Sequence, residues 1–328
     1  MRLRSSLVLA AFALTPGFVV ACSATTNNTF GDSSGGAGGA SATESTSGSG
    51  GSSDIGVFAG SGGNLAGGGG SNSGGGCSAA AELVYVLSEE NDLYSFEPDK
   101  KVFTKIGALK CQTSLTPNSM AIDRNAVAWV NYVADDDSEG AIFKVSTADA
   151  SCTKTNIKLG QGWTRLGMGF STDASGGDTE TLFVTGTTLD GNSPGLGKID
   201  FTTNKVVSVG NFSGSLKGQS AELTGTGDAK LYGFFTTTPV VVTEITKTSG
   251  ATPSPKKLNS VETPEAWAFS FWGGAFYLYT FDEFSDDSSR VNKYDPTTGT
   301  VDTSYMEDVG FTIVGAGVST CAPLKPPS

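Results

Sequence analysis

Acid–base chemistry in this chain cannot use imidazole, because its 328 residues include no histidine. That composition removes Ser-His-Asp triads, imidazole general bases and most zinc and copper sites. Glu222 is the candidate general acid or base, since it lies within a predicted strand. The alternative is that Glu222 occupies a polar, wet strand end. Asp123, Asp173 and Asp228 each precede a predicted turn, where aspartate is favoured for its local hydrogen bonds.

A larger group of carboxylates is clustered in predicted loops that share one face of the fold, and we call this group the acidic loops. Its members are Glu89, Glu90, Asp92, Asp135, Asp136, Asp137, Asp282, Glu283, Asp286 and Asp287. Calcium takes six to eight oxygen ligands, but these loops lack the alternating spacing and the glycine of a dedicated calcium loop. No metal site is therefore assigned, and calcium stays an open alternative. The acidic loops are otherwise interpreted as a solvated face or as a contact surface for a basic partner.

Residues 1–21 have the composition of an export signal. Arg2 and Arg4 precede an apolar run that is too short to span a bilayer. Val19-Val20-Ala21-Cys22 resembles the lipobox of bacterial type II signal peptides, whose cysteine is lipidated before cleavage. The alternative is an ordinary signal peptide with a nearby cysteine. The resemblance implies a lipid anchor on Cys22, and Ser23 in place of aspartate implies sorting to the outer membrane.

Residues 22–76 form a segment of Gly, Ser, Ala, Thr and Asn that has almost no large apolar side chains. Such a segment cannot bury enough surface to offset its ordering entropy, so it is predicted to be a flexible tether. A Gly-rich coil of this length has a root-mean-square reach of roughly 40 Å. The following domain would therefore stand away from the membrane.

The rest of the chain repeats a strand–turn–strand pattern that is clearest at Lys293-Tyr294-Asp295-Pro296-Thr297-Thr298-Gly299-Thr300-Val301. The apolar residue that marks this pattern recurs at positions 96, 145, 199, 245 and 294. A period near 50 in strand-rich sequence indicates β-propeller blades, each with strands A to D from the axis outward. We predict an all-β propeller over residues 77–323 with five four-stranded blades, or alternatively six, and a short tail at 324–328.

Ring closure is predicted from the strand count. Blade one lacks an A strand before its B strand, and Phe311-Thr320 has no B, C or D strand after it. Pairing these two regions would leave no open sheet edge. Because Cys77 and Cys321 flank this junction, we predict that they form a disulfide. Cys111 and Cys152 then pair by elimination, although the strand assignment puts them at opposite ends of the outer edge.

The net charge and the aromatic residues limit the classes of partner that this chain can bind. The formal charge of −12 argues against nucleic acid, which requires a basic field. In Ala266-Trp267-Ala268-Phe269-Ser270-Phe271-Trp272, aromatic side chains alternate with small ones, which is typical of packing between blades. The alternative is a carbohydrate-stacking surface that includes Trp163 or Trp272.

The chain resembles tethered β-propeller lipoproteins of the myxobacterial kind in five of its segments. These are the lipobox, the tether, Ala221-Glu222-Leu223-Thr224-Gly225-Thr226-Gly227-Asp228, the run 266–274 and the run 311–321. This resemblance brings no assigned activity. The acidic loops are interpreted as the contact face of a binding module for a protein, peptide or glycan at the cell envelope. The alternative is an enzyme acting on a carbohydrate or lactone through channel carboxylates such as Glu222.

Overall fold

A computed structural model describes residues 76–187, 192–284 and 286–327. These residues belong to the compact unit Gly69–Ser328. The predicted signal peptide, Cys22 and all but the last residue of the predicted tether lie outside the described ranges. Within the described part of the chain, no helix has the length and apolar character needed to cross a membrane.

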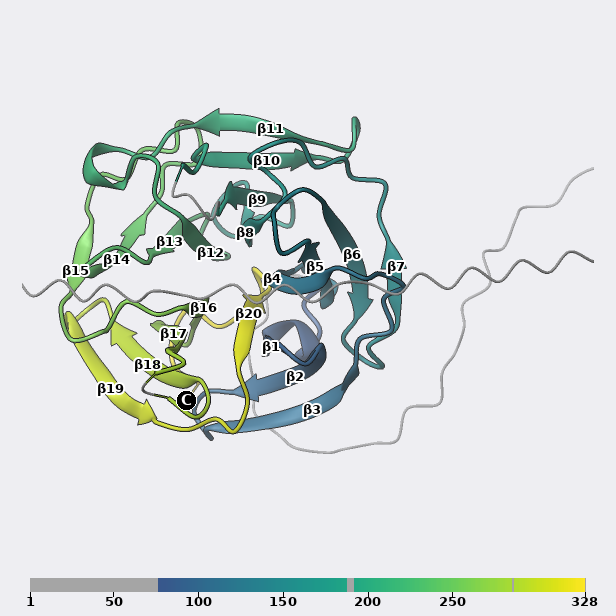
Figure 1. Ribbon diagram of the computed structural model, residues 1–328. Coiled ribbons are helices and arrows are strands. Elements are labelled where there is room, and N and C mark those ends of the chain that lie inside the picture. The colour runs from purple at the N-terminus through teal and green to yellow at the C-terminus, as the bar shows by residue number, and fades with distance from the viewer. Residues whose placement is uncertain (1–75, 188–191, 285, 328) are drawn as a thin grey trace, which may run out of the picture. The chain divides into compact units, whose positions relative to one another are not determined.

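The described residues form a five-bladed β-propeller, seen along its axis in Figure 1. Each blade is a four-stranded antiparallel sheet. From the axis outward, blade one consists of β20 (Ile313–Val318), β1 (Val84–Ser88), β2 (Asp92–Glu97) and β3 (Val102–Ala108); blade two of β4 (Thr116–Ile122), β5 (Val127–Val133), β6 (Gly140–Ser146) and β7 (Cys152–Lys154); blade three of β8 (Leu166–Thr172), β9 (Glu180–Gly186), β10 (Leu196–Asp200) and β11 (Lys205–Gly210); blade four of β12 (Ala221–Gly225), β13 (Leu231–Phe235), β14 (Val240–Glu244) and β15 (Lys256–Leu258); and blade five of β16 (Ala266–Trp272), β17 (Ala275–Phe281), β18 (Arg290–Asp295) and β19 (Thr300–Met306). The five-blade prediction is confirmed, and the six-blade alternative is wrong.

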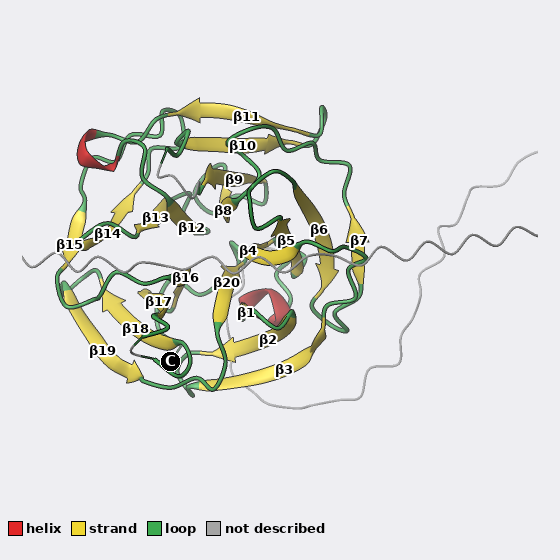
Figure 2. Ribbon diagram, in the orientation of Figure 1, coloured by secondary structure: helices red, strands yellow, loops and turns green. Residues whose placement is uncertain are grey.

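The ring closes as predicted, because β20 pairs with β1 in antiparallel register from Val84↔Val318 to Leu87↔Gly315. The first and last strands of the propeller thus complete one blade. Two short 3-10 helices lie outside the blades, η1 (Ala79–Glu82) and η2 (Gly214–Leu216), and they are the red segments in Figure 2. The side chain of Ser78 accepts a hydrogen bond from the Ala81 N–H and so caps η1 just after the closing cysteine.

The inner strands β4, β8, β12, β16 and β20 contact one another around the axis. Glycine makes this approach possible. A Cβ added at Gly167 would lie 2.0 Å from the carbonyl oxygen of Ala221, and one at Gly225 would lie 2.0 Å from that of Phe170. Both contacts are to the backbone of a neighbouring blade. The inner strands of blades three and four are therefore closely packed beside the axis.

The hydrophobic core is divided into layers between blades. Phe269 and Phe271 pack with blade four, whereas Ala268 and Trp272 pack with blade one. The Trp272 indole is buried and its Nε1 donates a hydrogen bond to the carbonyl oxygen of Glu82 at 2.9 Å. The prediction that this run packs between blades is confirmed, and Trp272 is not an exposed stacking surface.

The outer strands β3, β7, β11, β15 and β19 run along the periphery of the ring (Figure 1), because strand twist accumulates across each blade. The end of one outer strand therefore meets the C-to-D turn of the next blade. At the junction of blades one and two, the Lys110 N–H donates to the carbonyl oxygen of Ala150 at 3.2 Å. Cys111 and Cys152 meet at this junction and form a disulfide with a Cα–Cα distance of 4.9 Å. The pairing by elimination is confirmed, and the expectation that these cysteines lie at opposite ends of the outer edge is wrong.

Candidate functional site

Glu222 lies on the innermost strand of blade four, and its side chain is buried, with 3% of its surface exposed. The Ser119 hydroxyl of blade two donates a hydrogen bond to Glu222 Oε2 at 2.8 Å, and the backbone N–H of Met168 in blade three also donates to this carboxyl group. Burial raises the pKa of Glu222 well above its usual value, and the two hydrogen bonds oppose this shift only in part. Glu222 therefore joins three inner strands and is not at a wet strand end.

Catalysis by Glu222 would require a second carboxylate close by. Within the described ranges, no other acid contributes to the pKa shift of Glu222. No group of three or more His, Cys, Asp or Glu residues there could hold a metal ion. The arrangement around Glu222 can hold a neutral carboxyl group in a packed axis, and this is a structural use of the side chain.

Substituting Glu222 with glutamine is expected to change how stability depends on pH. Because the pKa of Glu222 is raised in the folded protein, its proton stabilises the fold fully below the unfolded pKa of about 4.3. That contribution is lost as pH rises through the folded pKa. Relative to Glu222→Gln, the wild type should lose free energy of unfolding above pH 4.3, at up to about 1.4 kcal/mol per pH unit. Urea unfolding between pH 4 and pH 8 measures this difference.

Glu307→Gln is the matched control, because Glu307 is exposed. Its pH profile should run parallel to that of the wild type. Parallel profiles for Glu222→Gln and the wild type would instead mean that Glu222 is solvated in the folded protein.

The acidic loops use part of their charge within the protein. Asp92 pairs with Lys105 at 2.6 Å, Asp137 with Arg165 at 2.7 Å, and Asp286 with Arg290. Other members stabilise their own loops: the Asp136 side chain accepts from the Ser138 N–H, and that of Asp282 accepts from the Phe284 N–H. The members that are exposed to solvent are Glu89, Glu90, Asp135, Asp136, Glu283 and Asp287.

Two residues of the acidic loops, Asp282 and Asp286, help to line a hollow at the junction of blades four and five. Its volume is about 210 Å³, and its lining includes Glu262, Asp282, Asp286, Arg290 and Asn292. We call it the acidic hollow. Phe284, on the loop that contributes Asp282, has 86% of its surface exposed. Carboxylates and one guanidinium group thus line the hollow, and the loop between Asp282 and Asp286 also carries the exposed ring of Phe284.

A second hollow of about 270 Å³ lies between blades two and three, and we call it the lysine hollow. Trp129, Phe201 and Lys144 contribute to its lining. The sequence reasoning missed this site. The one signal in the sequence was Phe201, an aromatic residue in the turn after Asp200, where polar residues are usual.

Asp123 and Asp228 make local hydrogen bonds at the ends of inner strands, as predicted for turn residues, and the Asp228 side chain accepts from the Thr226 hydroxyl. The side-chain bond of Asp173 instead reaches the neighbouring strand β9. The Asp123 side chain accepts hydrogen bonds from the N–H groups of Asn125 and Val127, and its second oxygen accepts from Trp129 Nε1 at 3.0 Å. Asp173 accepts from the Thr181 hydroxyl at 2.7 Å. The Asp123 side chain thus sets both the turn and the orientation of the Trp129 indole.

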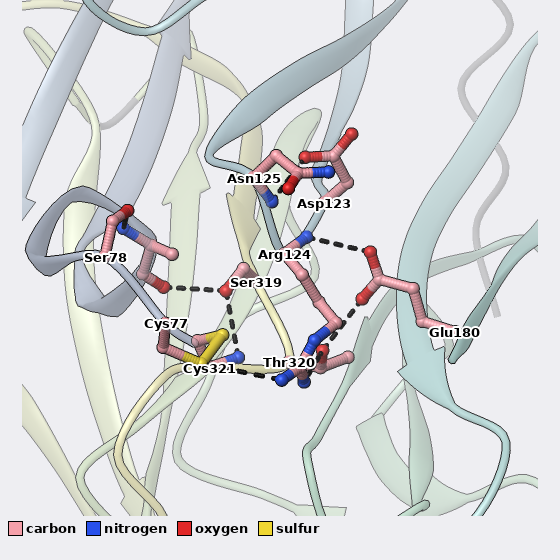
Figure 3. The surroundings of a disulfide bond; sticks show 10 residues. Cys77, Ser78, Asp123, Arg124, Asn125, Glu180, Ser319, Thr320 and Cys321 are labelled. Atoms are coloured by element: carbon pink, nitrogen blue, oxygen red, sulfur yellow. Dashed lines mark hydrogen bonds between the residues drawn. A yellow bond between two sulfur atoms is a disulfide. The ribbon is translucent and has the colours of Figure 1, made fainter. Parts of the chain in front are cut away.

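The predicted disulfide Cys77–Cys321 forms at the closure of the ring, with a Cα–Cα distance of 5.9 Å. Figure 3 shows that Arg124 reaches from the β4–β5 turn toward it. The Arg124 N–H donates to Glu180 Oε1 at 2.8 Å, Nη1 donates to the Thr320 hydroxyl at 3.1 Å, and Nη2 lies 3.6 Å from the Cys77 sulfur. The Thr320 hydroxyl in turn donates to Glu180 Oε2 at 2.8 Å. This cluster ties blades one, two and three together beside the disulfide.

Burial raises the pKa of Glu180, opposed by the hydrogen bonds from the Arg124 N–H and the Thr320 hydroxyl. Both oxygens of this carboxyl group are therefore engaged by the protein itself, and Glu180 is part of the closure rather than a free acid.

Comparison with known proteins bears on the fold alone. No family model matches the chain, and no curated protein matches it. Among 268 matching chains of solved structures is one from the mitotic checkpoint complex, 12% identical, with a TM-score of 0.38, covering 66% of this chain and 59% of that one. A protein of unknown function from Bacteroides caccae is 12% identical with a TM-score of 0.39, covering 72% of this chain and 97% of that one.

A third similar structure is the calcium-binding protein regucalcin from Agrobacterium tumefaciens, 14% identical with a TM-score of 0.39. That match covers 73% of this chain and 75% of regucalcin. Likenesses at this identity say nothing about ligands or reactions, and the strand order of the five sheets is what defines this chain as a β-propeller.

Proposed function

We propose that this chain is a binding module held at the bacterial envelope by a lipid on Cys22, and that it binds a basic peptide segment of another protein at the acidic hollow. The observation that carries the proposal is Phe284, which is 86% exposed on an acidic loop. Aromatic residues at the centre of an interface contribute strongly to binding, and surrounding carboxylates favour a basic partner.

The Arg290 side chain supports the same surface. Its Nη2 donates to Asp286, but its buried Nε has no hydrogen-bond partner in the part of the chain that the structure describes. Buried donors are nearly always paired with an acceptor. Arg290 lines the acidic hollow and its side chain is 38% exposed, so a carbonyl oxygen of a bound peptide can accept from the exposed part of the guanidinium group rather than from Nε.

The packed axis favours binding over the carbohydrate- or lactone-active alternative. That alternative depended on Glu222, whose carboxyl group is buried and held by Ser119 and Met168. A propeller whose axis is filled offers its rim loops for contact. We therefore place the function at the seams between blades.

The proposed location follows from the cysteines. The disulfides Cys77–Cys321 and Cys111–Cys152 are typical of an oxidising, extracytoplasmic compartment. With Cys22 lipidated, residues 23–76 would tether the propeller to the membrane, and Ser23 in place of aspartate favours the outer membrane. Such a tether lets one anchored module search for partners within its reach.

Peptide binding tests this function. A fluorescent peptide of alternating lysine and leucine residues should bind the full exported chain in mild detergent, and a glutamate–leucine peptide should not. Phe284→Ala should weaken binding about tenfold or more, as for a central aromatic residue. Raising the salt from about 50 to 300 mM should also weaken it, because exposed charges are screened. Fluorescence anisotropy measures both effects.

Val207→Ala is the matched control, since Val207 is 40% exposed on blade three. It should leave the peptide affinity unchanged within about twofold. Equal binding of the two peptides, or equal affinity of Phe284→Ala and wild type, would contradict the proposal.

A further inference from the structure

The lysine hollow is chemically distinct from the acidic loops. It lies where the chain after β7 meets the C-to-D turn of blade three, and its lining includes Trp129, Lys144, Asn156, Phe201 and Asn204. Its volume of about 270 Å³ is slightly below the usual range for drug-sized ligands, about 300–1,000 Å³. A hollow of this size suits one six-membered ring with its substituents.

Two aromatic rings form a fixed apolar corner of this hollow. The ring centroids of Trp129 and Phe201 are 5.1 Å apart and the rings are tilted by 49°. The hydrogen bond from Trp129 Nε1 to Asp123 Oδ2 holds the indole in place. Phe201 has 45% of its surface exposed and Trp129 only 7%, so the Phe201 ring is open to a ligand and the buried indole supports it from behind. Aromatic faces of this kind stack against the C–H face of a sugar ring as well as against planar groups.

Lysine side chains give the same hollow a positive charge. Lys144 Nζ lies 4.3 Å from the centre of the Trp129 ring, which places its charge at the aromatic corner. Lys154 also lines the hollow. At the adjoining junction, Lys158 and Lys205 form a parallel backbone bridge, and the Lys158 N–H donates to the carbonyl oxygen of Asn204 at 2.8 Å. Within the described ranges, neither Lys144 nor Lys154 makes an ion pair with a protein carboxylate.

Asp200 and Asp123 are acids in the segments that carry Phe201 and hold Trp129, and both accept hydrogen bonds from the protein itself. The Asp200 carboxylate, in the turn that carries Phe201, accepts hydrogen bonds from the N–H groups of Thr202 and Thr203 and from the Thr203 hydroxyl. These bonds lower the pKa of Asp200, with the Thr203 side chain as the largest cause. Asp123 is engaged by the indole and by its own turn. The described lining of the hollow includes Lys144 and Lys154 and no carboxylate, so in a chain with a formal charge of −12 it is a local site for an anion.

The combined features specify a ligand class. A carboxylate would pair with Lys144, a sugar ring would stack on the exposed ring of Phe201, and the amides of Asn156 and Asn204 would bond to hydroxyl groups. We propose that the lysine hollow binds an acidic sugar residue, a hexuronic acid unit of an anionic polysaccharide. This site is separate from the proposed peptide surface, and neither proposal depends on the other.

Calorimetry of the full exported chain in mild detergent tests this site with D-glucuronate and a glucuronate-containing oligosaccharide. D-glucose is the neutral comparison, and adenosine monophosphate is the planar anionic comparison. We expect a dissociation constant on the order of millimolar for glucuronate, tighter binding of the oligosaccharide, and binding of glucose at least about tenfold weaker. Phe201→Ala should weaken glucuronate binding about tenfold, through loss of the stacking face. Lys144→Met keeps most of the side-chain stem, and it should reduce the preference for glucuronate over glucose.

The controls are Val102→Ala, at a residue 44% exposed on blade one, and Lys257→Met on β15 of blade four. Both should bind glucuronate as the wild type does. Each variant is compared by its thermal unfolding, and Phe201 and Lys144 are exposed enough that the fold should be kept. No binding of glucuronate, equal binding of glucose, tighter binding of adenosine monophosphate, or unchanged binding by Phe201→Ala would each overturn the proposal.

Discussion

Replacing Cys77 and Cys321 together with serine is expected to lower the free energy of unfolding by about 5 kcal/mol. The disulfide joins residues separated by 244 positions, so its loss frees almost the whole propeller chain in the unfolded state. The same change also releases β20, whose pairing with β1 completes blade one. Urea unfolding of the oxidised wild type and the double variant measures the loss.

The second disulfide provides the control. Cys111 and Cys152 are separated by 41 positions, so replacing both should cost about 4 kcal/mol in the same chain-entropy model. That variant should keep the amide protons of β20 protected from exchange, whereas the variant without Cys77 and Cys321 should lose this protection first. Equal protection of β20 in both variants would mean that hydrogen bonding to β1 alone holds the closure.

The architecture was largely predictable because its signals are local. Turn residues recur with the period of a blade, and the alternation of large and small residues marks each strand. The missing A strand at one end and the extra strand at the other then predicted the closure, and with it the pairing of Cys77 and Cys321. The boundaries of outer strands follow less directly from such patterns, and β7 is only the three residues Cys152–Lys154.

The arrangement of the outer edge could not be predicted in the same way, because strand twist accumulates over a whole blade. This twist brings Cys111 to Cys152, and it brings the turn of Phe201 to the end of β7. Trp129 and Phe201 meet across two blades, and no local pattern relates them. The sequence therefore did not predict the lysine hollow, and the unusual position of Phe201 in a turn was the one sign of it.

The environment of Glu222 was equally hidden. Its position within an inner strand was predicted, but its burial depends on how closely five inner strands approach the axis. Ser119 and Met168 reach its carboxyl group from two other blades. A sequence pattern can place a residue on a strand face, and only the ring geometry decides whether that face holds a reactive or a packed side chain.

Substituting alanine for Gly225 or Gly167 is expected to destabilise the propeller by about 3 kcal/mol, because both positions face the backbone of a neighbouring inner strand. The added Cβ would lie 2.0 Å from the carbonyl oxygen of Phe170 or of Ala221, respectively. Backbone atoms at the axis cannot move aside as a flexible side chain can. Thermal and urea unfolding of the two variants measure the cost.

Gly160→Ala is the matched control, since a Cβ at Gly160 would meet no heavy atom within 4 Å. It should change the free energy of unfolding by no more than about 0.5 kcal/mol. If Gly225→Ala were as stable as this control, the inner strands would have room between them and a channel beside Glu222 would become credible. A loss of stability confined to Gly167→Ala and Gly225→Ala would instead support a filled axis, which directs the search for ligands to the acidic hollow and the lysine hollow.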